Sequence, residues 1–149
     1  MYKRILVPLD GSKRAEVIIP YVEALARNCG AKIIFVRVVE PEPILVATEP
    51  VYPQFDADSY RYKMNEAEAY LTGWCGELRE KGIEVKQSVC HGPIVESLID
   101  VVERENIDLI ALASHGRTGL PRVIFGSVTA ALLHQIDRPL LVIRSLENE

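Results

Sequence analysis

The sequence predicts an α/β protein with an open, doubly wound sheet of five parallel strands in a single domain, residues 1–149. Two kinds of segment in the sequence lead to this prediction. Short apolar runs alternate along the chain with longer segments in which apolar residues recur at the helical period. Parallel strands joined by right-handed helical crossovers form such a sheet. The length also suits one domain, since single domains typically have ~100 to 200 residues.

The start of the chain predicts a strand, a turn and a helix. Ile5 to Val7 is an apolar run without alternation, as expected for a strand that is covered on both faces. Pro8 ends this strand, and residues 9–12 turn into a helix of about 17 residues that ends at Gly30. Pro20 lies inside this helix and should kink it or mark a shorter first turn.

The second strand, Ala31 to Val39, precedes a proline-rich connection and a long helix. Residues Glu40 to Asp58 predict an irregular connection, which at the carboxyl end of a strand could cover a ligand. A helix is expected from Ala57 to Lys81. Its inward-facing candidates are Tyr62, Ala69, Tyr70, Leu71, Trp74 and Leu78.

The second half of the chain continues the alternation. A third strand, Ile83 to Val89, has the pattern of a sheet edge, and Pro93 fits the first turn of the helix that follows. The fourth strand is expected from Asp108 to Ala113. A helix that begins near Ser127 then leads to the last apolar run, Leu140 to Ile143.

The segment between the last two strands predicts an anion site. The first N–H groups of a helix lack intrahelical partners and carry the positive end of the helix dipole, so an anion is stabilised there. Gly126 lets a ligand approach the backbone, and the hydroxyls of Ser127 and Thr129 add donors. In the alternative interpretation, Ser127 is a plain N-cap and the glycines are plain turn residues.

The distribution of charge supports the anion site. The whole chain has a net charge of −4, but no carboxylate stands between Asp108 and Asp137. The ionisable residues in this stretch are Arg117, Arg122, His115 and His134. A positive region in an acidic protein favours an anionic ligand, so the segment as a whole predicts phosphate binding.

The expected topology brings a carboxylate to the same place. Ligands of doubly wound sheets bind beyond the carboxyl ends of the strands, where the strand order reverses. The loops after the first and fourth strands would face each other there, which places Asp10 opposite the anion loop. Asp10 can instead be a turn or N-cap carboxylate before the first helix, a role that does not exclude ligand contact.

Composition argues against several functions. The acidic balance disfavours non-specific binding to nucleic acid or to an anionic membrane. No apolar stretch of about 20 residues and no secretion leader is found, so we expect a soluble, cytoplasmic protein. Three cysteines without C-x-x-C spacing disfavour a disulfide framework or a zinc site. Cys90 and His91 would point to opposite faces of a strand, so they are not expected to form a catalytic pair.

Three segments of this chain together resemble the universal stress protein family. They are Val7-Pro8-Leu9-Asp10-Gly11-Ser12, Ala113-Ser114-His115-Gly116 and, nine residues later, Gly126-Ser127. The nucleotide-binding branch of that family carries glycine, two residues, glycine, nine residues, and then glycine followed by serine or threonine. Ala113 stands at the first glycine position. If position 113 is strand-like, as its place at the end of a strand favours, the alanine only trims space near the ligand. A positive φ at this position would instead argue against ATP binding.

The resemblance covers essentially the whole chain and implies a Rossmann-like, adenine nucleotide alpha hydrolase-like sheet of order 3-2-1-4-5 with ATP in the crevice. It implies that Asp10 engages the ribose or a Mg²⁺ or Mn²⁺ ion on the phosphates, that Pro8 walls the adenine, and that the backbone of Val38 binds the adenine edge. AMP, ADP or a cyclic adenine nucleotide would be read similarly. The residues implied to surround the ribose and phosphates are Ala113, Gly116, Arg117, Gly126, Ser127, Val128 and Thr129.

The function implied is a nucleotide-dependent stress-response or signalling module. The resemblance also implies a homodimer through antiparallel pairing of the edge strand Pro139 to Arg144, with Leu141 and Ile143 among the contacts. An alternative is a slow ATPase or phosphotransferase in which Asp10 holds a metal and His115 orients water. Because the P-loop lysine pattern is missing, no enzymatic activity is assigned beyond weak hydrolysis. A dimeric interaction module without nucleotide is the third alternative.

Overall fold

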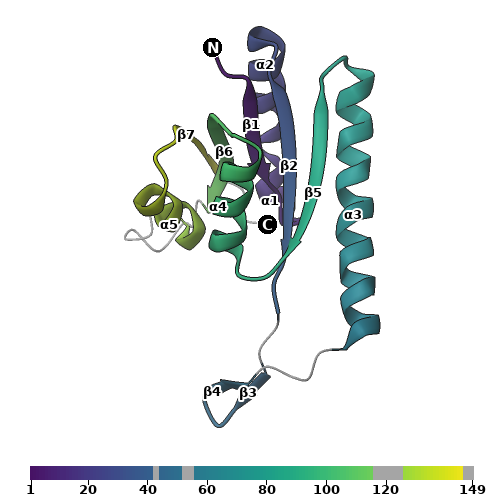
Figure 1. The fold of residues 1–149 in the computed structure, drawn as a ribbon, viewed down its shortest axis with the longest axis vertical. Helices are drawn as coiled ribbons and strands as arrows, with labels where there is room; N and C mark the ends of the chain where they lie inside the picture. The colour runs from purple at the N-terminus through teal and green to yellow at the C-terminus, as the bar shows by residue number, and fades with distance from the viewer. Residues whose placement is uncertain (42–43, 52–55, 116–125, 146–149) are drawn as a thin grey trace.

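Five parallel strands form one sheet in the order β5-β2-β1-β6-β7 (Figure 1). The computed structural model describes residues 1–41, 44–51, 56–115 and 126–145. The strands of this sheet are β1 (Arg4–Pro8), β2 (Lys32–Val39), β5 (Val85–His91), β6 (Leu109–His115) and β7 (Leu140–Ser145). In chain order they are the first, second, third, fourth and fifth strands of the sheet, so the predicted order 3-2-1-4-5 is confirmed.

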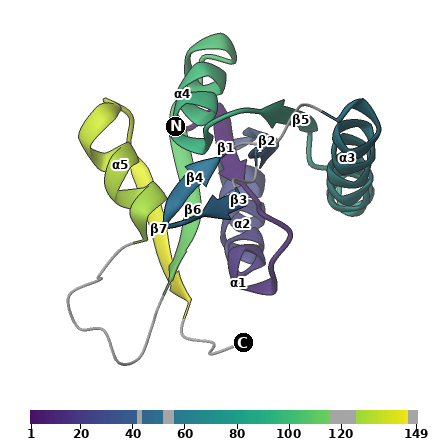
Figure 2. The same cartoon turned by 90° about the horizontal axis from the view of Figure 1, so that it is seen from below.

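Helices cover both faces of this sheet (Figure 2). On one face lie α1 (Lys13–Glu16), α2 (Ile19–Cys29) and α3 (Ala57–Glu80). On the other face lie α4 (Ile94–Arg104) and α5 (Ser127–Gln135). The prediction of a doubly wound α/β sheet is therefore confirmed.

Each face of the sheet builds its own hydrophobic core from alternate residues of the strands. On β2, Phe35 belongs to the core under α1, α2 and α3, which we call the α3-side core. Its neighbour Val36 belongs to the core under α4 and α5, the α4-side core. Both side chains are buried, as expected for a strand that is covered on both faces.

The first predicted helix is two helices, and Pro20 is the second residue of the second one, α2. Proline occupies the first turn of α2, where its missing N–H would have no partner, and the chain bends between Glu16 and Ile19. Ser12 caps α1, since its Oγ accepts a hydrogen bond from the Ala15 N–H at 3.1 Å. The predicted effect of Pro20 is confirmed.

The connection after β2 is more ordered than the sequence predicts. It contains an antiparallel hairpin of β3 (Ile44–Val46) and β4 (Glu49–Val51). The two turn residues, Ala47 and Thr48, have φ values of 50° and 78°. The prediction of an irregular connection was wrong here, because this turn uses neither Gly nor Asn, the residues that usually mark a two-residue hairpin.

The long helix α3 packs through only part of its predicted inward face. Leu71 and Leu78 are buried, and Tyr70 and Trp74 pack against the α3-side core, so these four predictions are confirmed. Tyr62 is 70% exposed and Ala69 is exposed, so these two were wrong. Figure 1 shows the reason for Tyr62: the first turns of α3 project beyond the end of the five-stranded sheet.

The third strand of the sheet begins later than predicted. β5 starts at Val85 and continues to His91, whereas the sequence placed the strand at residues 83–89. Ile83 is buried and its N–H bonds to the carbonyl of Leu78 in the turn after α3, so it belongs to the core without belonging to the strand. The position of this strand at a sheet edge is confirmed.

Candidate functional site

A cavity of about 120 Å³ lies at the carboxyl ends of the central strands, on the side of α4 and α5. β1 and β6 are neighbours in the sheet but far apart in the sequence, so this is where the strand order reverses. The lining residues are Pro8, Leu9, Asp10, Ala15, Val36, Val38, Ile94, Leu98, Leu112, Ala113, Ser114, Gly126, Ser127, Val128 and Thr129.

Eight residues singled out from the sequence line this cavity. They come from three loops or strand ends, after β1, β2 and β6, and from the beginning of α5. Their names are Pro8, Asp10, Val38, Ala113, Gly126, Ser127, Val128 and Thr129. Two further predicted residues, Gly116 and Arg117, lie outside the described residues.

The sequence did not single out the apolar wall of the cavity. Val36 and Val38 point to this side of β2, and Ile94 and Leu98 reach it from α4. Leu112 closes the wall from β6. An apolar helical face predicts burial, but it does not say whether the side chain will contact other side chains or a hollow. The one available signal was the strand period, since Val36 shares a face with Val38.

The loop after β1 holds the Asp10 carboxylate in a defined turn. Its Oδ1 accepts hydrogen bonds from the Ser12 N–H at 2.9 Å and from the Ser12 hydroxyl at 2.6 Å. Ser12, not Asp10, is the N-cap of α1. Asp10 is therefore the turn carboxylate of the alternative interpretation, and it also lines the cavity.

The beginning of α5 faces the same cavity. Gly126 is its N-cap, with extended backbone angles and no side-chain cap bond, and Ser127 is the first helical residue. The interpretation of Ser127 as a plain N-cap was therefore wrong. Helix geometry leaves the N–H groups of Ser127, Val128 and Thr129 without acceptors inside the helix, so an anion in the cavity can accept from them.

Ala113 has the strand conformation that the sequence favours. It lies in β6 and pairs with Ile143 of β7. Among the described residues other than glycine, positive φ occurs only at Ala47, Thr48 and Asn106. Glycine is therefore not required at position 113 by the backbone, and its methyl group only occupies space beside the cavity.

Two buried hydroxyl residues sit where β6 ends and α5 begins. Ser114 and Thr129 are each 2% exposed, and both line the cavity. The Oγ of Ser114 has no hydrogen-bond partner in the part of the chain that the structure describes. A buried donor without a partner costs about 1–3 kcal/mol, which makes this end of the cavity polar and unsatisfied.

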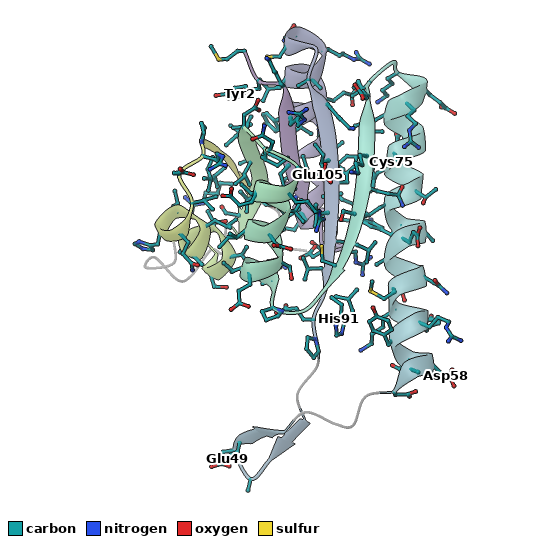
Figure 3. The ribbon with its side chains drawn as sticks, in the orientation of Figure 1. Tyr2, Glu49, Asp58, Cys75, His91 and Glu105 are labelled. Atoms are coloured by element: carbon teal, nitrogen blue, oxygen red, sulfur yellow. The ribbon has the colours of Figure 1, made fainter. Side chains whose placement is uncertain are left out.

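The side chains that could carry catalysis or bind a metal are those of histidine, cysteine, aspartate and glutamate. His115 belongs to β6, but its side chain lies outside the described part of the structure. No group of three or more His, Cys, Asp or Glu residues in the described ranges could hold a metal ion. The three cysteines are free thiols. Cys75 lies on α3 (Figure 3), and its burial raises the pKa of its thiol. Within the described ranges, no helix is long and apolar enough to cross a membrane.

The fold and the cavity together define the class of this protein. It is a doubly wound α/β domain whose cavity lies at the reversal of strand order, the place where such domains bind their ligands. The model of the universal stress protein family matches residues 1–144. The chain therefore belongs to the universal stress protein family.

Curated relatives match the chain along nearly its whole length. Universal stress protein MJ0577 of Methanocaldococcus jannaschii is 26% identical over 155 residues, which is 97% of this chain and 96% of that protein. Universal stress protein A homolog 1 of Coxiella burnetii is 29% identical over 133 residues, 89% of this chain and 90% of that protein.

Solved structures share the same fold. The structure of MJ0577 covers 100% of this chain and 99% of its own, with a TM-score of 0.79 and 26% identity. A universal stress protein in complex with cAMP matches with a TM-score of 0.61 and 18% identity, covering 97% of this chain and 98% of its own. The protein from Archaeoglobus fulgidus in complex with dAMP matches with a TM-score of 0.59 and 17% identity, covering 95% and 98%.

Proposed function

We propose that this chain is an ATP-binding universal stress protein, a cytoplasmic module whose state depends on the nucleotide. The observation that carries the proposal is the position of one cavity between the Asp10 turn and the beginning of α5. The N–H groups at the beginning of a helix have no acceptors inside the helix and can stabilise a phosphate. A carboxylate across the cavity can bind ribose hydroxyls or a metal ion.

The chemistry of the lining suggests how the nucleotide lies. Val36, Val38 and Leu98 offer an apolar wall to the adenine, next to Pro8. At the other end, the N–H groups and hydroxyls of the first turn of α5 offer donors to the phosphates. The proposed role of Asp10 is to bind the ribose, or a Mg²⁺ or Mn²⁺ ion carried in by the phosphates.

Two relatives of the same fold make adenine nucleotides the ligands to test first. One has been solved with cAMP and another with dAMP. Both carry an adenine and a phosphate group, which match the apolar and donor-rich ends of the cavity in this chain. ATP leads the proposal, and AMP, ADP and cAMP are its competitors in the assay.

The test begins with protein purified without added nucleotide. Any bound small molecule is released by denaturation and identified by chromatography, and the stripped protein is titrated with ATP and Mg²⁺ by calorimetry. We expect saturable binding that is lost in Gly126→Val, because the branched side chain would fill the space at the helix end. Gly76→Val is the matched control, since Gly76 is exposed on α3 with open space around it.

The outcomes separate the proposed function from its alternatives. Bound nucleotide that stays unhydrolysed supports a nucleotide-dependent module. Turnover that disappears in Asp10→Ala would indicate an ATPase or phosphotransferase instead. No binding by the native protein, with or without Mg²⁺, would leave only a dimeric interaction module.

The same proposal includes a homodimer through β7. This strand is at the edge of the sheet and pairs only with β6 in the described structure, and its residues Leu141 and Ile143 are half-buried. An apolar strand at an edge favours pairing with another strand. Light scattering should report a dimer for the native chain and a monomer for Ile143→Lys. Leu133→Lys, at an exposed apolar residue of α5, should remain a dimer.

A further inference from the structure

We propose that Arg37 is a positioning residue of the candidate site: its guanidinium group, which lies close to both Gly11 and the ring of Tyr70, fixes the loop that presents Asp10. The inference rests on the proposed function in one respect, which is that Asp10 contacts the nucleotide. The role of Arg37 in the loop itself can be tested without any ligand.

Arg37 lies on the opposite side of β2 from the cavity. Val36 and Val38, its neighbours in the strand, line the cavity. Since strand residues alternate between faces, Arg37 projects with Phe35 toward α1 and α3. Any effect of this cation on a ligand in the cavity must therefore act through another group.

That group is the loop after β1. The guanidinium lies so close to Gly11 that a Cβ atom added there would be 3.0 Å from one terminal nitrogen and 3.2 Å from the central carbon of Arg37. Gly11 has φ = +87°, a conformation that other residues rarely adopt. The absence of a side chain therefore serves two needs: the turn itself and the close approach of Arg37.

Tyr70 of α3 contacts the same guanidinium group. The central carbon of Arg37 is 5.1 Å from the centroid of the Tyr70 ring, which is a cation–π distance. The Tyr70 hydroxyl in turn donates a hydrogen bond to the carboxylate of Glu16, the last residue of α1. Burial, followed by this hydrogen bond, raises the pKa of Tyr70, so the phenol keeps its proton to higher pH than an ordinary tyrosine does.

β2 therefore holds the loop at two successive points. The Leu9 N–H donates to the Val36 carbonyl at 2.8 Å, and Arg37 backs Gly11 from the next residue along the strand. Asp10 lies between these two points, with its carboxylate turned to Ser12. A flat guanidinium can contact a backbone on one face and a ring on the other, which the ammonium group of lysine cannot do.

The decisive measurement is amide hydrogen exchange, monitored by NMR, on the nucleotide-free full-length protein. The Ser12 N–H, which bonds to Asp10, reports the loop, and the Ile34 N–H reports the core of the sheet. In Arg37→Met we expect Ser12 exchange to speed up roughly fivefold relative to Ile34, the size expected for loss of a cation–π contact. Arg37→Lys should speed Ser12 exchange less than Arg37→Met does, because its ammonium group can still approach the Tyr70 ring while the flat face beside Gly11 is lost.

Three further variants sharpen the test. Tyr70→Phe keeps the ring and should leave Ser12 exchange relative to Ile34 unchanged, whereas Tyr70→Leu should raise this ratio as Arg37→Met does. Arg27→Met removes an arginine on α2 that pairs with Glu23 far along the chain from the loop, and should change neither amide. Equal acceleration of Ser12 and Ile34 exchange in Arg37→Met would assign Arg37 to general stability. No acceleration of Ser12 exchange would show that Arg37 does not hold the loop. Either result would overturn the proposal.

Nucleotide titration then separates this inference from the proposed function. If the native protein binds ATP, Arg37→Met should weaken binding by a factor similar to its effect on Ser12 exchange. If the native protein does not bind ATP, the proposed function fails while the exchange data still decide the role of Arg37. Unchanged affinity despite a loosened loop would contradict the coupling of Arg37 to Asp10.

Discussion

The two faces of the sheet are built from the same strands, but they differ in how side chains fill them at the carboxyl ends of the strands. At the carboxyl ends of the strands, the face under α1, α2 and α3 is filled by side chains, since Arg37 contacts Tyr70 and approaches Gly11 there. A pocket on this face, with Ala26, Ala31 and Ile83 in its lining, lies instead at the amino ends of β2 and β5. Under α4 and α5 the α4-side core opens into the cavity at the carboxyl ends of the strands. The helices differ accordingly, since α3 has 24 residues while α4 has 11 and α5 has 9. The filled face supports the structure, and the incompletely covered face provides the site.

The largest effect should come from truncating adjacent residues of β2 that face opposite sides. Phe35→Ala removes a fully buried ring from the filled face and should lower the free energy of unfolding by about 3–5 kcal/mol. Val36→Ala should cost only about 2 kcal/mol, because it deletes less and lies at a wall that already faces a hollow. Urea unfolding of the two variants measures the difference. Equal losses would contradict the contrast between the faces.

The next effect concerns the hydrogen bond that closes the filled face. Tyr70→Phe removes the donor to Glu16 and should lower the free energy of unfolding by about 1–2 kcal/mol at pH 7. The folded pKa of Tyr70 is raised above its ordinary value of about 10, so this stability is present below pH ~10 and is lost as pH rises further. Denaturant titrations from pH 7 to 11 should show the two proteins converge. A difference that grows with pH would refute the assigned cause.

A smaller effect is expected at Ala113, which touches both regions. Its side chain packs against the α3-side core and it also lines the cavity. Ala113→Gly should lower the free energy of unfolding by about 0.5–1 kcal/mol through added chain entropy. Because the backbone is already strand-like, ATP affinity should stay within about twofold of the native value. A large gain in affinity would mean that the methyl group obstructs the ligand.

The smallest effect should come from the contacts that tie β5 to the helices. On the cavity side, Lys86 donates to Glu105 at the end of α4 at 2.7 Å. This hydrogen bond is the main reason why the pKa of Glu105 is lowered, so the stabilisation is present above pH ~4.3 and is lost as pH falls below it. Lys86→Met should cost about 0.5 kcal/mol at pH 7 and nothing at pH 3, by thermal unfolding.

The matching contact on the filled face serves as the control for that variant. Gln87 donates to the Thr72 hydroxyl at 3.0 Å and to the Glu68 carbonyl at 3.2 Å, both on α3. No charged partner takes part in these bonds. The loss caused by Gln87→Ala should therefore be the same at pH 3 and pH 7, and a pH-dependent loss there would show that the Lys86 result is not specific.

Much of this arrangement can be predicted from the sequence because it is local. Apolar runs place the strands, Pro20 divides the first helix, and helical crossovers make the sheet parallel, while the strand order comes from the family resemblance. The sequence also predicts that the loops after β1 and β6 lie close together, since parallel strands have their carboxyl ends at the same edge of a sheet. These rules predict Asp10 and the beginning of α5 at one crevice from the sequence alone.

The remaining features depend on tertiary contacts that no local pattern encodes. Ile94 and Leu98 read as core residues whether or not a hollow faces them. The hairpin turn at Ala47 and Thr48 has positive φ without Gly or Asn. From the sequence, Arg37 is a charged residue near the end of a strand, and its contacts with Gly11 and Tyr70 appear only in the structure. The sequence therefore predicted the loops of the site better than the side chains that wall and brace it.

The place of β1 in the middle of the sheet has a consequence for synthesis of the chain. β1 pairs with β2 on one side, which follows soon after it, and with β6 on the other, which is made on the order of 100 residues later. At about 5–20 residues per second, its second edge stays open for roughly 5–20 s on the ribosome. The Asp108 carboxylate accepts from the N–H groups of Lys3 at 2.8 Å and Arg4 at 3.1 Å, so it joins that edge as soon as β6 arrives. Nascent chains stalled before Asp108 should therefore expose an unpaired β1 edge to chaperones.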